Sequence, residues 1–197
     1  DQFLLGDALL VAPILHGGEQ QPAIVRDGVK YQERRVMLPP GWWFDLNRGV
    51  WIGGERMLTY TAALEELPLF VRDGAVLPYF AGPLRNGCMD LSAVELHLFC
   101  HEQPARFEYV LDDQKTQRYE TGAWSSAGIT AKVQEDRLMV TVVETGHYPR
   151  ETVTFAPVIY SRPEVQELEL TLNGRTVTRP LQTEQREWLC RMLPVRA

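Results

Sequence analysis

Short stretches in which apolar and polar residues alternate recur along this chain, and they constrain its fold more than any other feature. Residues 94–100 place Val94, Leu96, Leu98 and Cys100 at every second position. Successive side chains of a strand point to opposite faces, so this pattern predicts a strand with one apolar face. The same alternation is found around Phe107–Leu111, Leu138–Val142 and Val153–Phe155.

The clearest turn lies near the end of the chain. Leu168, Leu170 and Leu172 alternate up to the pair Asn173-Gly174, and Val177 follows. Both residues of such a pair accept a positive φ, which the tight turn of a β-hairpin requires. The sequence therefore predicts a hairpin here.

The first half of the chain also contains strand signals. Leu9–Ala12 is a short continuous apolar run, which is typical of a strand that is buried on both faces. Arg35–Leu38 precedes the turn formers Pro39-Pro40-Gly41. Two stretches resemble helix instead: the residues before Gly6, and Ala62–Leu67, where Pro68 would stop a single turn.

Many short strands separated by Gly and Pro turns predict an all-β fold, with two consecutive antiparallel β-sandwich modules. Residues 81–87 are rich in turn formers and have no period, so they fit a linker. We expect a first module over residues 1–81, a linker over 82–91 and a second module over 92–197.

Composition excludes several classes of partner. The 197 residues are 45% hydrophobic, which is enough to bury a core. A net charge of -6 disfavours nucleic acid, because binding phosphates needs clustered Lys and Arg. No apolar run approaches the roughly 20 residues that cross a bilayer. We therefore predict neither nucleic acid nor membrane as a partner.

The three cysteines, Cys88, Cys100 and Cys190, lie far apart and lack the paired short spacing of a zinc site. They are interpreted as free thiols of a cytoplasmic or otherwise reduced protein. One disulfide with a spare thiol is the alternative.

The beginning of the chain is unusual. It opens without Met, and Asp1–Pro13 is already apolar, whereas a native terminus is usually polar and frays. It also lacks the charged region, apolar segment and cleavage site of a signal peptide. We expect the chain to be a piece of something longer, with Phe3, Leu4 and Leu5 exposed where a missing part once covered them.

Specific motifs occur in three places along the chain. The first is Asp1–Pro13, the second pairs Arg35–Asp45 with Leu67–Pro78, and the third is Tyr109–Gln114 with Tyr119–Gly122. In this order they resemble the C-terminal part of glycoside hydrolase family 31, the α-glucosidase and α-xylosidase family. The family usually has Gly at the position of Gln114.

The resemblance implies a parent enzyme with a (β/α)8 barrel upstream, whose two carboxylates form and resolve a glycosyl-enzyme intermediate. No segment here matches either carboxylate motif. The chain is therefore expected to be non-catalytic, with no catalytic, cofactor-binding or metal-binding residue and no cofactor. Its expected role is to support the barrel, its main partner, and to form a homo-oligomer with other copies. A carbohydrate-binding module and an interaction protein without sugar chemistry are the alternatives.

Asp112 and Asp113 are the candidate pair of catalytic carboxyl groups. Retaining glycosidases need two carboxyl groups about 5 to 5.5 Å apart. Adjacent side chains in an extended chain point different ways, so these two are interpreted as a turn whose carboxylates accept local backbone N–H groups. A calcium site is the alternative, because hard oxygen ligands suit that ion.

Aromatic residues are the second candidate for a functional site. Trp42, Trp43, Trp51 and Tyr60 are interpreted as core, and the alternative is a sugar-stacking platform. Exposed, coplanar rings would favour sugar binding, and buried rings would favour a scaffold. The four histidines, His16, His97, His101 and His147, are interpreted as ordinary surface or core residues rather than metal ligands.

Overall fold

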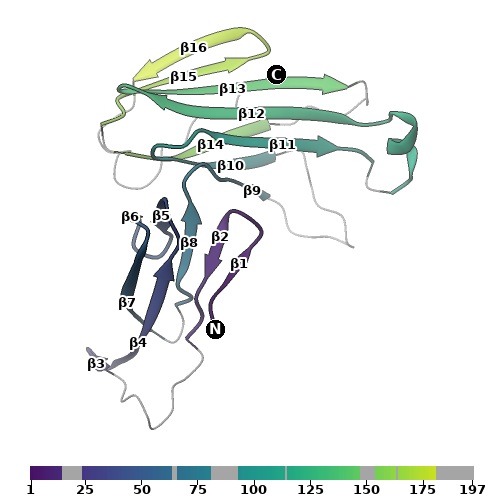
Figure 1. The fold of residues 1–197 in the computed structure, drawn as a ribbon. Coiled ribbons are helices and arrows are strands. Elements are labelled where there is room, and N and C mark those ends of the chain that lie inside the picture. Colours follow the sequence, from purple (N-terminus) through teal and green to yellow (C-terminus); the bar gives the residue numbers. More distant parts are fainter. Residues whose placement is uncertain are drawn as a thin grey trace. The chain divides into compact units, whose positions relative to one another are not determined.

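The computed structural model describes residues 1–14, 24–63, 66–80, 93–113, 115–146, 154–162 and 164–180. The chain forms two compact units, Asp1–Asp73 and Gly74–Ala197. Strands dominate both units (Figure 1), and the described part has one short 3-10 helix, η1 (Arg118–Thr121), and no α-helix. The predicted all-β fold is confirmed. The described residues include no helix that is long and apolar enough to cross a membrane.

The first unit is a sandwich of two antiparallel sheets. One sheet has the order β1 (Phe3–Leu5), β2 (Leu9–Val11), β8 (Leu69–Arg72), β5 (Trp42–Asp45) and β6 (Val50–Gly53). The other has the order β3 (Ile24–Arg26), β4 (Val29–Leu38) and β7 (Arg56–Ala63). Their inner faces share one core, formed by Leu10, Ala12, Val36, Leu38, Trp43, Tyr60, Ala62 and Phe70.

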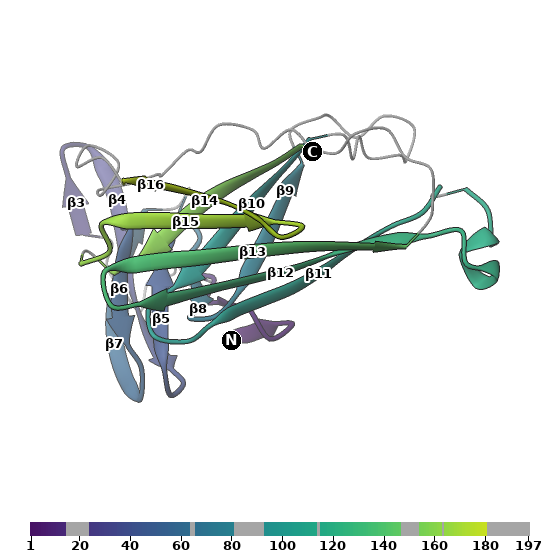
Figure 2. The ribbon, with the colours of Figure 1, turned by 90° about the horizontal axis from the view of Figure 1, so that it is seen from above.

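The second unit also packs two sheets face to face (Figure 2). The three-stranded sheet has the order β14 (Thr154–Ser161), β10 (Ala93–Cys100) and β9 (Val76–Phe80). The five-stranded sheet has the order β11 (Ala105–Leu111), β12 (Ser125–Gln134), β13 (Arg137–Gly146), β15 (Glu167–Leu172) and β16 (Arg175–Pro180).

The alternating residues found in the sequence form the core of this second unit. Val94, Leu96, Leu98 and Cys100 of β10 are all buried, and they pack against the inward residues of β11, β12, β13 and β15. Cys88 and Cys190 lie outside the described residues. The hairpin is also confirmed, because Asn173 and Gly174 join β15 to β16 with φ angles of 46° and 82°.

Two pairs of neighbouring strands are parallel, whereas the sequence analysis expects antiparallel strands throughout. β10 pairs parallel with β14, and β13 pairs parallel with β15. A parallel pair needs a crossover connection, and here the chain passes from β13 to β14 in the other sheet before it returns to β15. Alternation within a strand carries no information about the direction of its neighbour.

Both helical predictions fail where the structure describes them. Phe3–Leu5, before Gly6, forms the edge strand β1 and pairs with β2. Ala62 and Ala63 end the strand β7, and residues 64 and 65 lie outside the described part of the chain. Pairing of β1 with β2, and of β7 with β4, overrides a weak local preference for helix.

The strand Val76–Phe80, which the sequence analysis places in the first module, pairs with β10 in the second unit. The compact units divide between Asp73 and Gly74. The predicted linker over residues 82–91 lies outside the described residues. About a dozen residues separate β9 from β10, and no local sequence pattern indicates that these two strands pair.

Gly54 lets two turns of the first unit approach closely. Its N–H donates to the Gly41 carbonyl at 2.7 Å, and a Cβ atom there would lie 1.8 Å from the Pro39 carbonyl oxygen. We expect Gly54→Ala to lower the free energy of unfolding of the first unit by about 2–4 kcal/mol in urea titrations. Gly53→Ala is the matched control, since its Cβ would meet nothing closer than 3.9 Å. Equal stability of the two variants would contradict this reading.

Candidate functional site

The acidic turn is held by Asp113. Its Oδ1 accepts the backbone N–H groups of Lys115 and Thr116 at 3.0 and 2.8 Å, and its Oδ2 accepts the Thr116 hydroxyl at 2.6 Å. These are the local bonds that the turn interpretation predicts. Among the described residues no group of three His, Cys, Asp or Glu side chains is placed to hold a metal ion.

Hydrogen bonds also set the charge of this carboxyl. The Thr116 hydroxyl, followed by the backbone N–H groups of Thr116 and Lys115, lowers the pKa of Asp113 to about 2. Asp113 is therefore ionised at neutral pH, which is incompatible with the role of a general acid.

An NMR titration of the Asp113 carboxyl should give a pKa of about 2, below the ordinary 3.8. The folded-state pKa is the lower one, so this carboxylate stabilises the fold above the ordinary pKa, and the contribution is lost as the pH falls from about 4 to about 2. Thr116→Val removes the hydroxyl donor and should raise the pKa toward 3.8. A wild-type pKa near 3.8 would show that the turn is not closed in solution.

Trp42, Trp43 and Trp51 do not form an exposed platform. Trp43 is fully buried, and its Nε1–H donates to the Pro39 carbonyl at 2.9 Å. Trp51 is half-buried and meets Phe44 edge-on, with ring centroids 5.2 Å apart and an interplanar angle of 69°. Trp42 is half-buried as well. Buried and tilted rings favour the scaffold interpretation over sugar stacking.

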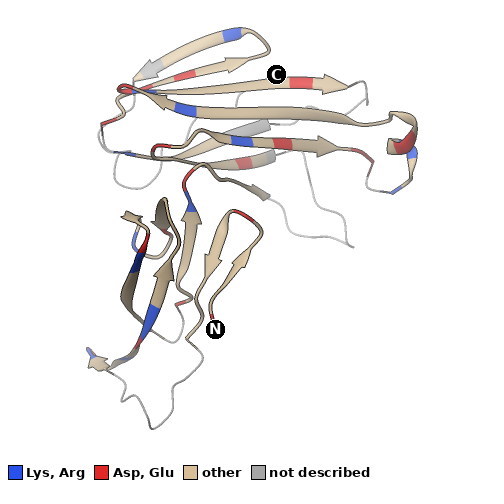
Figure 3. Ribbon diagram, in the orientation of Figure 1, with Lys and Arg blue, Asp and Glu red and all other residues tan. Residues whose placement is uncertain are grey.

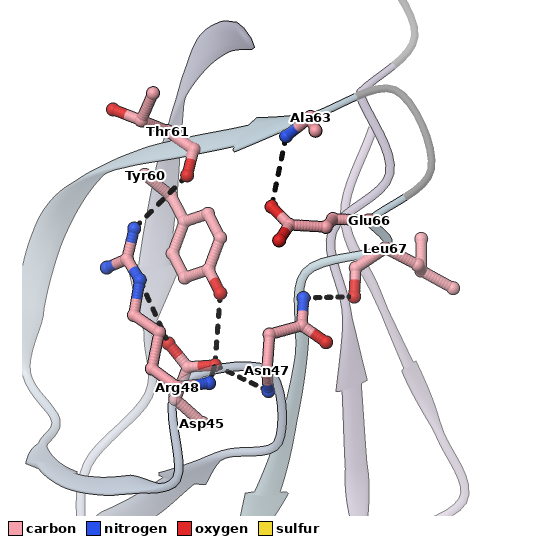
Figure 4. A network of polar contacts seen from close by, with 8 residues as sticks. All are labelled: Asp45, Asn47, Arg48, Tyr60, Thr61, Ala63, Glu66 and Leu67. Carbon is pink, nitrogen blue, oxygen red and sulfur yellow. Dashed lines mark hydrogen bonds and ion pairs between the residues drawn. The ribbon is translucent and has the colours of Figure 1, made fainter. Parts of the chain in front are cut away.

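The sequence analysis missed a buried carboxylate, Asp45, at the end of β5. Its Oδ1 accepts the backbone N–H groups of Asn47 and Arg48 at 3.0 and 3.1 Å and the Tyr60 hydroxyl at 3.0 Å (Figure 4). The residue is 0% exposed. A buried carboxylate needs such donors to offset its lost hydration. The run Asp45–Gly49, with its Asp, Asn and Gly, is the turn signal that could have revealed it.

Arg48 and Asn47 extend this network to neighbouring segments (Figure 4). The Arg48 guanidinium lies 3.8 Å above the centre of the Tyr60 ring, and its Nε is 3.8 Å from Asp45 Oδ2. Asn47 donates through Nδ2 to the Leu67 carbonyl at 2.9 Å. Burial, followed by the charge of Asp45, raises the pKa of Tyr60 to about 12, so its hydroxyl remains a donor. The network fastens the β5–β6 turn to β7 and to the segment before β8.

We expect Tyr60→Phe to destabilise the first unit by about 1–3 kcal/mol, because Asp45 loses a donor inside the core. Urea denaturation measures the loss. Tyr31→Phe, a half-buried tyrosine on β4, is the control for removing a hydroxyl. In a double-mutant cycle Tyr60→Phe and Asp45→Asn should be strongly non-additive. Additive effects would refute the coupling.

The histidines are placed as ordinary residues where the structure describes them. His97 Nδ1 lies 2.9 Å from the Tyr160 hydroxyl oxygen, and the His97 ring centroid is 4.1 Å from that of Tyr79. His101 lies just beyond the end of β10. His16 and His147 lie outside the described residues.

Two carboxylates do share a pocket in the second unit. Glu108 and Asp112 line a pocket of about 380 Å³ on β11, together with Val110, Tyr119 and Trp124. Four residues of extended chain separate their backbones by about 13 Å, at roughly 3.3 Å per residue. A retaining pair must hold its carboxyl groups about 5 to 5.5 Å apart, much closer than these two backbones lie.

Comparison with known proteins relates the first unit to a family of domains. Residues 1–77 match the sequence model of the glycosyl hydrolase family 31 C-terminal domain. The matched segment comprises the first 77 of the 197 residues. This confirms the resemblance noted in the sequence.

Family 31 relatives extend the likeness beyond this domain. A 1,6-alpha-glucosyltransferase of Sporosarcina globispora is 28% identical over 67% of this chain, and an alpha-xylosidase of Saccharolobus solfataricus is 29% identical over 72%. The crystal structure of a family 31 alpha-xylosidase from Xanthomonas citri has the same fold over 92% of this chain, with 21% identity and a TM-score of 0.65. The chain spans only 10% and 18% of the length of the two relatives, and 19% of the crystallised enzyme.

Proposed function

We propose that this chain is the non-catalytic C-terminal part of a retaining α-glucosidase-like glycoside hydrolase, in which it supports the catalytic barrel. The match of residues 1–77 to the family 31 C-terminal domain carries this proposal. The relatives are glycosidases and a glucosyltransferase many times longer than the matched segment. The substrate class we propose for the parent enzyme is an α-linked glucoside or xyloside.

The buried polar network of the first unit suits a supporting role. Asp45, Tyr60 and Arg48 stiffen the turn between β5 and β6 rather than open toward a ligand. Trp43 is likewise fully buried and does not open toward a ligand. Rigid packing of this kind favours a scaffold, and it disfavours a carbohydrate-binding module built on Trp42, Trp43 and Trp51.

The edge strand β1 offers a surface for the barrel. Phe3, Leu4 and Leu5 are 52%, 46% and 59% exposed, as the sequence analysis expects. β1 lies at the edge of its sheet, and the Gln2 side chain exchanges two hydrogen bonds with the backbone of Met37, which is itself 47% exposed. Adjoining exposed apolar residues at a sheet edge are typical of a surface that another part of a protein covers.

The test uses the catalytic barrel encoded in the same reading frame, co-expressed with this chain. We expect the two parts to co-purify and to hydrolyse aryl α-glucosides or α-xylosides, while the chain alone shows no turnover. Leu5→Asp should reduce co-purification and activity at least about tenfold, because it places a charge in an apolar contact. Val177→Asp is the matched control, since Val177 is 52% exposed on the edge strand β16.

Equal activity of the Leu5→Asp and Val177→Asp variants would show that β1 does not contact the barrel. Hydrolysis by the purified chain alone, lost on changing Glu108 or Asp112, would overturn the non-catalytic assignment. Circular dichroism must show that each variant keeps its strand content, so that unfolding is not mistaken for a lost contact.

A further inference from the structure

The outer face of the five-stranded sheet in the second unit carries a groove of two adjoining pockets. One, of about 380 Å³, is lined by Glu108, Val110, Asp112, Tyr119 and Trp124. The other, of about 420 Å³, lies over Arg106, Phe107, Glu108, Gly128, Ile129, Thr130 and Val143. Glu108 lines both pockets, so together they form one groove along β11.

The period of β11 explains why this face is available. Tyr109 and Leu111 point into the core and are buried, whereas the alternate residues Glu108 and Val110 are exposed. Gly128 on β12 has no side chain to fill the groove beside them. The hollow therefore follows from the register of β11 with β12, in which Glu108 lies opposite Gly128.

The loop between β11 and β12 is folded in a way that places two aromatic rings at one end of this groove. Asp113 ties the loop through Thr116, and η1 follows and ends at Gly122 with a φ of 90°. In Figures 1 and 2 η1 lies beyond the end of β11 and the start of β12. Tyr119 and Trp124 flank the end of η1, and they are 47% and 38% exposed.

Gly146 at the end of β13 allows the backbone of Trp124 to approach closely. Its φ is 95°, and a Cβ atom there would lie 2.5 Å from the Trp124 carbonyl oxygen. Only a glycine permits this approach without a shift of the backbone. Two exposed aromatic side chains that line one pocket are unlike scattered surface residues, and they are typical of a ligand or interaction surface.

The chemistry of the lining selects the ligand. Charges of both signs lie along β11 (Figure 3), but the ionisable side chains of the aromatic pocket are the carboxyls of Glu108 and Asp112 and the phenol of Tyr119. Carboxylates accept hydrogen bonds from hydroxyl groups and repel phosphates and other anions. Aromatic rings pack against the apolar C–H faces of pyranose rings. A neutral sugar presents both kinds of group at once.

We propose that this groove binds a neutral α-linked oligosaccharide, with a sugar ring against Tyr119 and Trp124 and its hydroxyl groups donating to Glu108 and Asp112. The sugar class rests on the proposed function, but the groove and its lining do not. Such a site would keep a polymeric substrate close to the barrel, which raises its effective concentration.

Isomaltotriose and maltotriose are the probes, titrated into the purified chain while backbone amide NMR shifts and tryptophan fluorescence are followed. We expect saturable shifts in residues 106–112 and 119–130, with a Kd near about 1 mM or tighter. Trp124→Phe should abolish the sugar-dependent fluorescence change, and Trp51→Phe should leave it intact. Tyr119→Ala and Glu108→Gln should each weaken binding at least about fivefold.

Two control measurements distinguish sugar binding from other occupants of the groove. Shifts of the same residues with calcium chloride but with neither sugar would assign the groove to a cation and overturn the proposal. Concentration-dependent shifts without ligand would assign it to a second copy of the chain, with the same consequence. Absence of binding by the folded chain at about 10 mM of either sugar would also overturn it.

Failure here leaves the proposed function standing, because co-purification with the barrel does not depend on Tyr119 or Trp124. Conversely, sugar binding by a chain that does not associate with a barrel would support the groove and contradict the scaffold role.

Discussion

Burial of inward-facing side chains against an opposite sheet holds each unit together, and the remaining features of the structure depend on it. In the first unit Trp43, Tyr60 and Phe70 fill the space between the sheets, and in the second the inward residues of β10 meet those of β11, β12 and β13. Each fully buried Leu, Ile or Val contributes about 1.5–3 kcal/mol relative to exposure. This packing fixes which face of every strand is left for other functions.

The buried carboxylate of Asp45 shows how such a core tolerates a charge. Removing a carboxylate from water is costly, and the cost is offset only when donors and an opposite charge surround it. The backbone of the β5–β6 turn, the Tyr60 hydroxyl and the Arg48 guanidinium provide both. The turn is thereby fixed at the rim of the first core, which is a property expected of a domain that supports another.

The two units use their outer surfaces differently. In the first, apolar residues gather on the edge strand β1, where they suit contact with another protein part. In the second, aromatic rings and carboxylates are combined in a groove along β11, where they suit a hydroxylated ligand. Under the two proposals, one chain carries a packing surface and a recognition surface, each attached to its own core.

The sequence alone determined several strands and the faces they bury, among them Val94–Cys100, Phe107–Leu111 and Leu138–Val142. It also determined the hairpin at Asn173-Gly174, the turn at Asp113 and the resemblance to family 31. Each of these features depends on residues that are close in sequence, because alternation sets the buried face of a strand and turn residues set local φ angles. Tertiary structure decided that β9 pairs with β10 and that β10 and β14 run parallel. It also decided the burial of Asp45 and the groove that joins Glu108 to Tyr119 and Trp124. These features depend on which distant strand lies alongside, and a period of two residues specifies a face without specifying the neighbour.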